Sequence, residues 1–574
     1  MTPCKRAQGH TTIRMDRVSA GQLDRGSVMH MAGGDHTGLV INKESPCLKE
    51  DTPPELSLEF KVFLTNSANN QHTQESRQLR FWFKPNLPDS EQMRCTQNFF
   101  KDLVTPSEFP RDYVGFIKKI MKLMQQRYPS IKRVEVELQQ LGEDPPTRPN
   151  SSLDDSGYCS KSTVSQSKVL EVIESAYPSS ISIPDIARAW QCTEEEVRHY
   201  IVELLAKGLV RCMDNGTYLR VTQNDTDQCV AEVKMVKQMP KVTRSQQPTI
   251  AIITAHFWEK VAVDAMIDNK DTYVKYKTEG ESNVYTLGNI GNHRVVSTKL
   301  PASGHFRSAT IAAGSTTTRL LGTFQKVEYV FLVGVGGGVP HYTDASKHVR
   351  LGDVVISAPP VGINDNYIYM YCERIKGSPE GNGPSTSPER YNIKTWSPPN
   401  FEIQHVAHQL WIHGCHYPEE RPWEAYIENA LRTLQSQEAD FTRPPSHTDK
   451  LFMALGGKDL IEVNHPQPPT GNDPRSYNMP VLHFGAVGCG RTLLRDDARR
   501  MEFAAQHGIV AFDTEFDAVV ESIYGNRKDN YVFIRGIADY KDGSKKKDWQ
   551  PHAALCAAGV MKAIIMTLDP IDDD

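Results

Sequence analysis

The sequence predicts an α/β fold for the C-terminal half of the chain, preceded by two smaller domains. Short apolar, β-branched runs recur in this half, and each is followed by glycines or an acid. Their positions are 249–254, 329–335, 507–512 and 531–538. Runs of this length are typical of strands buried on both faces of a sheet. Polar segments rich in Pro, Ser and Asp separate this half from the parts before it, which indicates several domains.

Composition excludes several classes of protein. A chain of 574 residues is long enough for three or four domains, and 39% hydrophobic with 24% charged residues is typical of a globular protein. The net charge of −5 gives no overall basic field for nucleic acid or acidic lipid. The eleven Cys include no C-x-x-C pair, which argues against a disulfide framework or a zinc ribbon. We therefore expect a reducing intracellular location, in the cytoplasm or alternatively the nucleus.

No segment of the sequence predicts contact with a membrane. The first ten residues, MTPCKRAQGH, lack the apolar stretch of a secretory signal. The most apolar segment, 553–568, is short and carries Lys562, so we interpret it as a buried helix.

Two parts are predicted before the first linker. Residues 1–54 are polar and lack sustained periodicity, which predicts a disordered tail. Residues 55–141 predict a small α+β domain whose function the pattern does not reveal. Apolar residues alternate with polar ones at 56–64, 78–85 and 131–138, which predicts strands. Apolar residues at helical spacing predict a helix at 113–128.

Two linkers are predicted, at 142–164 and 222–248. The first contains D-S-G-Y-C-S, which resembles the D-S-G-x-x-S phosphodegron, with Ser156 and Ser160 as phosphosites. Such a motif needs two hydroxyls in an accessible turn, where their phosphates can meet Arg clusters. A plain flexible linker is the alternative.

Residues 165–221 predict three helices and a hairpin, an arrangement that resembles a winged-helix domain. Thr193 is placed to cap the third helix with Glu196 at the capping-box position. The segment holds six Lys or Arg and eight Asp or Glu, and its third helix begins with Glu194, Glu195 and Glu196. Acids at the start of a recognition helix would repel phosphates. We therefore predict protein docking rather than nucleic-acid binding.

Candidate catalytic residues follow the strands of the part from 249 to 568, which also contains a polar loop near 441–478. Glu259 follows the first run, Gly336 and Gly337 the second, Asp513 the third and Asp539 the fourth. Ligands of open α/β sheets bind beyond the carboxyl ends of strands, so these residues predict one shared site. The glycine run matches neither G-x-G-x-x-G nor the Walker motif, and no His or Glu spacing suits a metal. We therefore expect neither a cofactor nor a metal.

Several motifs of this part, in order along the chain, resemble the nucleoside phosphorylase superfamily. They are Y-T-L-G-N-I-G (285–291), V-G-V-G-G-G-V-P (333–340), R-L-G-D-V-V-I-S (350–357) and R-G-I-A-D-Y-K-D (535–542). The resemblance is greatest to the effector domains of fungal immune-receptor-like proteins, which are similar to methylthioadenosine/S-adenosylhomocysteine nucleosidases. It implies a three-layer domain with a twisted mixed sheet over 249–568, and a homo-oligomer.

The resemblance also implies roles for single residues. Glu259 falls on the acid that activates water, Asp539 on the acid that protonates the purine at N7, and Glu515 on the acid that grips the ribose hydroxyls. The cleavage needs these types, because the departing base must be neutralised and the incoming water must lose a proton. The remaining substrate contacts that it implies are Asp513, Gly336, Gly337, Leu494 and Arg307.

Hydrolysis is predicted over phosphorolysis. Phosphorylases of this superfamily hold phosphate with an Arg and a Ser at positions that here correspond to Leu332 and Val335. Neither side chain binds an anion, so water is the expected nucleophile. The sequence thus predicts a purine nucleosidase that cleaves a nucleoside or nucleotide. The alternatives are a nucleotide sensor or scaffold without turnover, docking through its winged helix, and a DNA-binding regulator.

Overall fold

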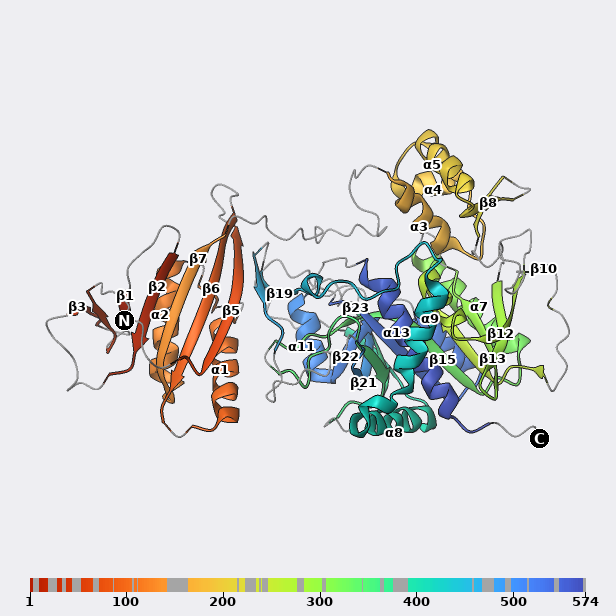
Figure 1. Ribbon diagram of the computed structural model, residues 1–574. Helices are drawn as coiled ribbons and strands as arrows, with labels where there is room; N and C mark the ends of the chain where they lie inside the picture. The colour runs from red at the N-terminus through yellow and green to blue at the C-terminus, as the bar shows by residue number, and fades with distance from the viewer. Residues whose placement is uncertain are drawn as a thin grey trace. The chain divides into compact units, whose positions relative to one another are not determined.

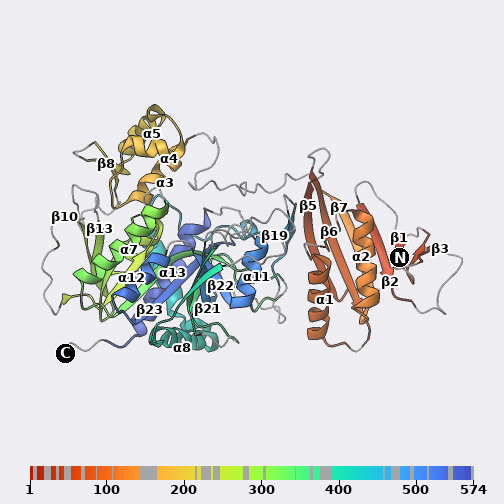
Figure 2. The same cartoon turned by 180° about the vertical axis from the view of Figure 1, so that it is seen from behind.

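The computed structural model describes most of the chain. The described residues are 1–3, 10–18, 28–33, 38–43, 53–65, 72–85, 87–105, 108–110, 112–141, 164–213, 216–221, 234–236, 239, 246–275, 283–301, 306–342, 344–361, 366–374, 391–456, 459–466, 479–490, 497–513, 516–540 and 547–570. They form two compact units, each described by itself below, and many of their elements are labelled in Figures 1 and 2. Unit 1 comprises Met1–Thr147, Pro340–His348 and Ser446–Ser476, and unit 2 comprises the remaining residues.

Unit 1 is an antiparallel sheet with two helices on one face. Its strands run in the order β1-β2-β7-β6-β5-β20-β19. Phe60 on β5 contacts Phe100 of α1 and Phe116 of α2 edge to face, so both helices cover the same side. The elements are β1 (Thr2–Pro3), β2 (His10–Asp16), β3 (Val28–Met31), β4 (Val40–Asn42), β5 (Leu56–Thr65), β6 (His72–Phe83), α1 (Asp89–Leu103), α2 (Tyr113–Gln126), β7 (Ile131–Gln140), β19 (Leu451–Gly456) and β20 (Asp459–Val463).

Two features of unit 1 differ from the sequence-based predictions. The prediction that residues 1–54 are disordered is wrong for β2. This strand pairs with β7 over seven residues and buries Ile13 and Met15. The predicted loop near 441–478 contains β19 and β20, and β20 pairs with β5. Both errors have one cause, because a short strand becomes recognisable only beside a partner that lies far away in the sequence.

The winged helix lies at the start of unit 2, as predicted. It comprises α3 (Gln166–Ala176), α4 (Ile183–Trp190), α5 (Glu194–Ala206) and the hairpin β8 (Val210–Cys212) with β9 (Tyr218–Arg220). Thr193 caps α5, since its Oγ1 accepts from the N–H of Glu196 at 3.3 Å while Glu196 Oε2 accepts from the N–H of Thr193 at 3.0 Å. Residues 142–163, with Ser156 and Ser160, lie outside the described residues.

The rest of unit 2 is built on a mixed sheet. Its described strands run β10-β12-β13-β14-β11-β15-β23-β16-β21-β17-β18, and β22 pairs with both β15 and β21. The strands are β10 (Lys234–Val236), β11 (Ile250–Thr254), β12 (Asp268–Lys275), β13 (Asn283–Ile290), β14 (His293–Lys299), β15 (Tyr329–Gly338), β16 (Val354–Ser357), β17 (Tyr369–Arg374), β18 (Tyr391–Trp396), β21 (Leu482–Cys489), β22 (Ile509–Asp513) and β23 (Asn530–Asp539). The predicted strand runs 249–254, 329–335, 507–512 and 531–538 correspond to β11, β15, β22 and β23.

The core of this sheet is organised around the C-terminal helix α13. Its side chains are buried over almost its whole length, against α6, α8 and α9 and the central strands. Figure 1 shows the ribbon of α13 in blue beside α9 and β15. The helices are α6 (Phe257–Asp264), α7 (Phe306–Thr323), α8 (Glu402–His416), α9 (Pro422–Leu434), α11 (Asp497–His507), α12 (Asp517–Gly525) and α13 (Trp549–Thr567). The interpretation of 553–568 as a buried helix is confirmed. Across the described ranges, no helix combines the length and the hydropathy that crossing a bilayer needs.

Candidate active site

Strand pairing brings three of the predicted strand ends together. Gly337 on β15 is the register partner of Phe512 on β22 and of Asp539 on β23. Asp513 follows Phe512 directly and ends β22. Gly337, Asp513 and Asp539 therefore meet at one edge of the sheet, as the sequence predicted.

Glu259 joins the same edge through backbone hydrogen bonds. Its Oε2 accepts from the N–H groups of Ala255 and His256, both at 2.8 Å, at the start of α6. Its Oε1 accepts from the N–H of Val335 on β15 at 2.7 Å. The side chain is only 2% exposed. A carboxylate has about four lone-pair directions, so three amides leave room for one further donor.

The glycines of the run have packing reasons as well as the predicted ligand-binding role. A Cβ at Gly334 would lie 2.5 Å from Oε1 of Glu259. At Gly336 it would lie 3.0 Å from the carbonyl oxygen of Phe512, and at Gly338 it would lie 2.9 Å from Cγ2 of Ile537. The run continues β15 rather than forming a loop, and its bare backbone lets the neighbouring strands and α6 approach closely.

Asp513 is engaged by a buried arginine that the sequence analysis did not single out. Arg535 on β23 donates to Asp513 Oδ2 from Nη2 at 3.0 Å, and from Nη1 to the carbonyl of Leu332 at 2.9 Å. The hydroxyl of Tyr369 donates to Asp513 Oδ1 at 2.9 Å. Both charged side chains are fully buried. A charged residue inside an apolar strand run needs such a partner, and this was the available sequence signal.

Phe516 packs on the same arginine. Its ring lies 4.1 Å from the Arg535 guanidinium and meets Phe533 edge to face. Phe533 is the second aromatic ring beside Arg535, and the ring of Tyr369 stacks on it with the ring centres 4.5 Å apart. Burial raises the pKa of Tyr369 well above its usual value, and the negative charge of Asp513 adds to this. The hydroxyl thus stays protonated and serves as a donor.

The backbone groups of Leu332 and Val335 are engaged within the protein. Leu332 is fully buried, and its carbonyl is occupied by Arg535. Val335 uses its N–H for Glu259.

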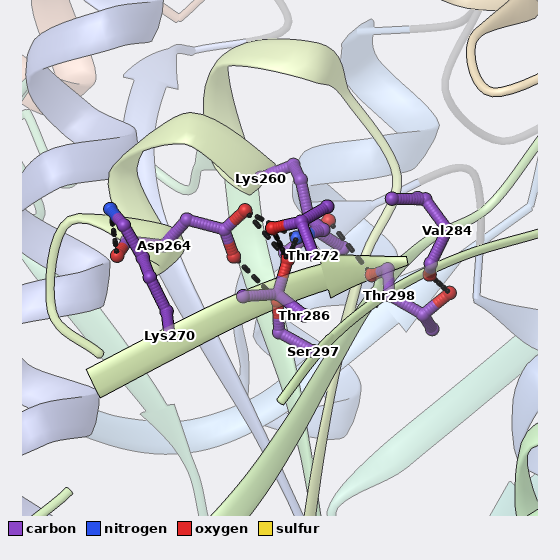
Figure 3. Close-up of polar contacts among 9 residues, drawn as sticks. Lys260, Asp264, Lys270, Thr272, Val284, Thr286, Ser297 and Thr298 are labelled. Carbon is purple, nitrogen blue, oxygen red and sulfur yellow. Dashed lines mark hydrogen bonds and ion pairs between the residues drawn. The ribbon is translucent and has the colours of Figure 1, made fainter. Parts of the chain in front are cut away.

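Helix α6, which carries Glu259, is anchored at its other end by a buried polar cluster (Figure 3). Asp264 accepts from Ser297 of β14 at 2.6 Å and from Thr286 of β13 at 3.1 Å, and it forms an ion pair with Lys260. Lys260 also donates to Thr286 at 2.7 Å. Burial lowers the pKa of Lys260. The cluster ties the helix to two strands, so the orientation of Glu259 does not depend on its own contacts alone.

The structure does not describe the side chains of three other predicted residues. Glu515 and Leu494 lie outside the described residues, and of Arg307 only the backbone, near the start of α7, is described. Within the described ranges, no cluster of three or more His, Cys, Asp or Glu side chains could hold a metal ion.

The comparisons with known proteins agree with the resemblances found in the sequence. Residues 155–222 match the family model of the winged helix-turn-helix domain, which confirms that prediction. A curated relative, a nucleotide-binding leucine-rich repeat (NLR)-like protein of Hyaloscypha variabilis, is 25% identical over 313 residues. That alignment covers 54% of this chain and 28% of the relative, so the chain spans less than a third of the relative's length.

Solved structures similar to the chain include a nucleosidase and a hydrolase. The 5′-methylthioadenosine/S-adenosylhomocysteine nucleosidase of Neisseria meningitidis, in complex with methylthio-immucillin-A, is 14% identical with a TM-score of 0.32. The match covers 56% of this chain and 100% of that one. Futalosine hydrolase of Helicobacter pylori is 13% identical with a TM-score of 0.32, and the match covers 57% of this chain and 100% of that one.

Proposed function

We propose that residues 249–568 hydrolyse the N-glycosidic bond of a purine nucleoside or nucleotide and release an adenine-type base. The observation that carries the proposal is the convergence of Glu259, Gly337 and Asp539 at one sheet edge, through register pairing and the Val335 N–H. We assign Glu259 to the activation of water and Asp539 to the protonation of the purine at N7. General acid–base catalysis of this kind contributes about 10²–10⁴-fold to the rate.

The remaining substrate contacts belong to the same proposal. Glu515 binds the ribose hydroxyls, and Gly336, Gly337, Leu494 and Arg307 line the substrate. Asp513 contributes to the substrate site by holding Arg535 and Tyr369 in place, because these two side chains already donate to both of its oxygens. Water is the nucleophile, since Leu332 is buried and Arg535 is committed to an ion pair. We further propose a homo-oligomer in the cytoplasm or nucleus.

The test is release of free base from purified full-length protein. Adenosine, methylthioadenosine, S-adenosylhomocysteine, AMP and ATP are each incubated with and without phosphate, and free base is measured by chromatography. We expect adenine from at least one of them, independent of phosphate. Asp539→Asn should reduce the rate by about 10²–10⁴-fold while ligand binding persists, because an amide cannot protonate N7.

A matched control lies just before the same strand, β23. Asp529 is exposed and precedes β23 at its other end, so Asp529→Asn makes the same chemical change away from the site and should leave the rate unchanged. Glu515→Gln should weaken substrate binding as well as turnover. Release only with phosphate would contradict hydrolysis, and Arg307 would then be the first residue to replace.

The second candidate function is a nucleotide sensor that binds without turnover. It is favoured by the buried pairing of Asp513 with Arg535, which commits one acid of the site to structure. The NLR-like relative suits the same role. Binding of a nucleotide with no base released from any substrate would support this candidate and exclude the nucleosidase.

A further inference from the structure

The winged helix is joined to the sheet of unit 2 by a buried lysine. Lys299 ends β14, is completely buried, and donates to three carbonyl groups. Two of these belong to the end of α3 and the residue after it, Ser175 at 3.0 Å and Tyr177 at 2.8 Å, and the third is Leu300 at 3.0 Å. The last carbonyls of a helix lack partners within it, and a cation there also matches the helix dipole.

Aromatic and charged side chains extend this junction to the first turn of α6. The ring of Phe257 meets Tyr177 edge to face at 5.6 Å and lies 4.9 Å from the guanidinium of Arg220 on β9. Arg220 is buried and donates to Glu174 of α3 at 2.9 Å and to Glu438 at 3.2 Å. The winged helix therefore contacts the segment that leads into Glu259, two residues after Phe257.

The lysine is also next to the backbone that binds Glu259. Lys299 is the register partner of Thr254, the residue before Ala255, whose N–H donates to Glu259. Burial lowers the pKa of Lys299 to about 7, and the charges of Glu259 and Glu174 oppose that decrease. Two further polar ties join the winged helix to the rest of unit 2. One is Arg220 to Glu438 at 3.2 Å, in which the glutamate is 40% exposed. The other, Lys547 to Glu171 at 2.6 Å, is about half exposed on both sides, and such a pair contributes little. Of these three ties, that of Lys299 adjoins the backbone that binds Glu259.

We propose that Lys299 is a positioning residue through which the winged helix holds the first turn of α6, and with it Glu259, in its place at the site. The proposal goes beyond a docking role for the winged helix, because it makes that domain part of the catalytic geometry. The expected effect of Lys299 on turnover rests on the nucleosidase function proposed above. The expected effect of Lys299 on the position of Glu259 does not depend on that function.

The experiment compares Lys299→Met with Lys528→Met in the full chain. Lys528 is a matched control because it also donates to a backbone carbonyl, that of Val327 at 2.6 Å. Val327 precedes the start of β15, at the end of the strand away from Val335 and Glu259. Amide hydrogen exchange is followed at Ala255, His256 and Val335, the three donors to Glu259. We expect at least about tenfold faster exchange at these amides in Lys299→Met, with β16 and β21 unchanged, and no change in Lys528→Met.

Turnover supplies a second readout. Lys299→Met should lower kcat by up to about 10²-fold with little effect on KM, because misplacing a catalytic group affects the reacting geometry more than binding. Lys299→Arg, which keeps the charge and the donors, should restore most of both signals. If wild-type protein releases no base, the nucleosidase proposal fails, and the exchange measurement still decides on the positioning role.

Two results would overturn the proposal. The first is unchanged protection of Ala255, His256 and Val335 in a folded Lys299→Met. The second comes from a different variant, which is needed if Lys299→Met does not fold. Tyr177→Leu removes the ring contact with Phe257 and keeps the carbonyl of residue 177 that accepts from Lys299. We expect it to speed exchange at the same amides. Wild-type protection in Tyr177→Leu would then contradict the link between the winged helix and Glu259.

Discussion

At the scale of the residue, Gly334 shows how closely Glu259 is fitted into the sheet. A Cβ at this position would approach Oε1 and Cδ of Glu259 to 2.5 and 2.7 Å. Both distances are far below van der Waals contact. Residue 334 must therefore be glycine for the carboxylate of Glu259 to occupy its position.

Gly334→Ala should displace Glu259 and lower the free energy of unfolding by about 1–3 kcal/mol, the usual cost of overpacking a close-packed interior. Base release should fall with it. Gly322→Ala on α7 is the control, since a Cβ there meets nothing within 4 Å and alanine favours a helix by up to about 1 kcal/mol. Urea denaturation measures both, and equal stabilities of the two variants would contradict the packing argument.

His552 on α13 predicts a pH dependence of stability. Burial lowers its pKa from 6.5 to about 4, and Nδ1 faces the carbonyl of Phe441 at 3.3 Å. Because the unfolded chain binds this proton more readily, stability from this group is complete above pH ~6.5 and is lost as the pH falls towards 4. The difference corresponds to about 3 kcal/mol.

Urea denaturation between pH 7 and 4.5 checks this expectation. Wild-type stability should fall more steeply than that of His552→Gln, whose amide can donate to Phe441 without titrating. His416→Gln, at an exposed position of α8, should follow the wild type. Parallel curves for wild type and His552→Gln would show that the buried imidazole does not titrate as described.

At the scale of the element, α5 decides between the proposed roles of the winged helix. Its first turn carries Glu194, Glu195 and Glu196, all exposed. A recognition helix contacts DNA through its N-terminal residues, so three carboxylates would meet phosphates there.

We therefore expect the full chain to show no salt-sensitive binding to duplex DNA near micromolar concentration. Fluorescence anisotropy at low and at moderate salt is the measurement. Replacing Glu194 and Glu195 by Gln tests whether the acids are what prevents binding, while Glu196 is left in place because it caps the helix. Tight binding of wild type that weakens steeply with salt would refute the protein-docking interpretation.

At the scale of the whole molecule, unit 1 is assembled from three separate stretches of the chain. Its sheet begins with β1 and β2 near the N-terminus and ends with β20 and β19, which lie more than 300 residues later. The core of unit 1 and the core around α13 are formed by different residues.

Ile13→Ala should consequently destabilise unit 1 by about 2–4 kcal/mol, because Ile13 is 2% exposed on β2. Hydrogen exchange should accelerate in β5, β6 and β7 and remain unchanged in β15 and β23. Val18→Ala, at a side chain that is 51% exposed, is the control and should change neither. Unaltered exchange in β7 would mean that β2 does not belong to the sheet in solution.

The sequence by itself determined the features that depend on neighbouring residues. The apolar runs predicted β11, β15, β22 and β23, the Thr193–Glu196 spacing predicted the start of α5, and the acids after the strands predicted the sheet edge at which Glu259, Asp513 and Asp539 lie. These signals are local, because periodicity and capping involve residues a few positions apart.

Only the tertiary structure decided which distant groups are partners. Nothing near β2 or β20 in the sequence indicates β7 or β5 as the neighbouring strand. Likewise, Arg535 could be recognised as a buried charge, but its pairing with Asp513, and that of Lys299 with the carbonyls of α3, depend on folded geometry. Strand partners and buried charges are chosen by packing and desolvation across the whole fold, and no local pattern contains that information.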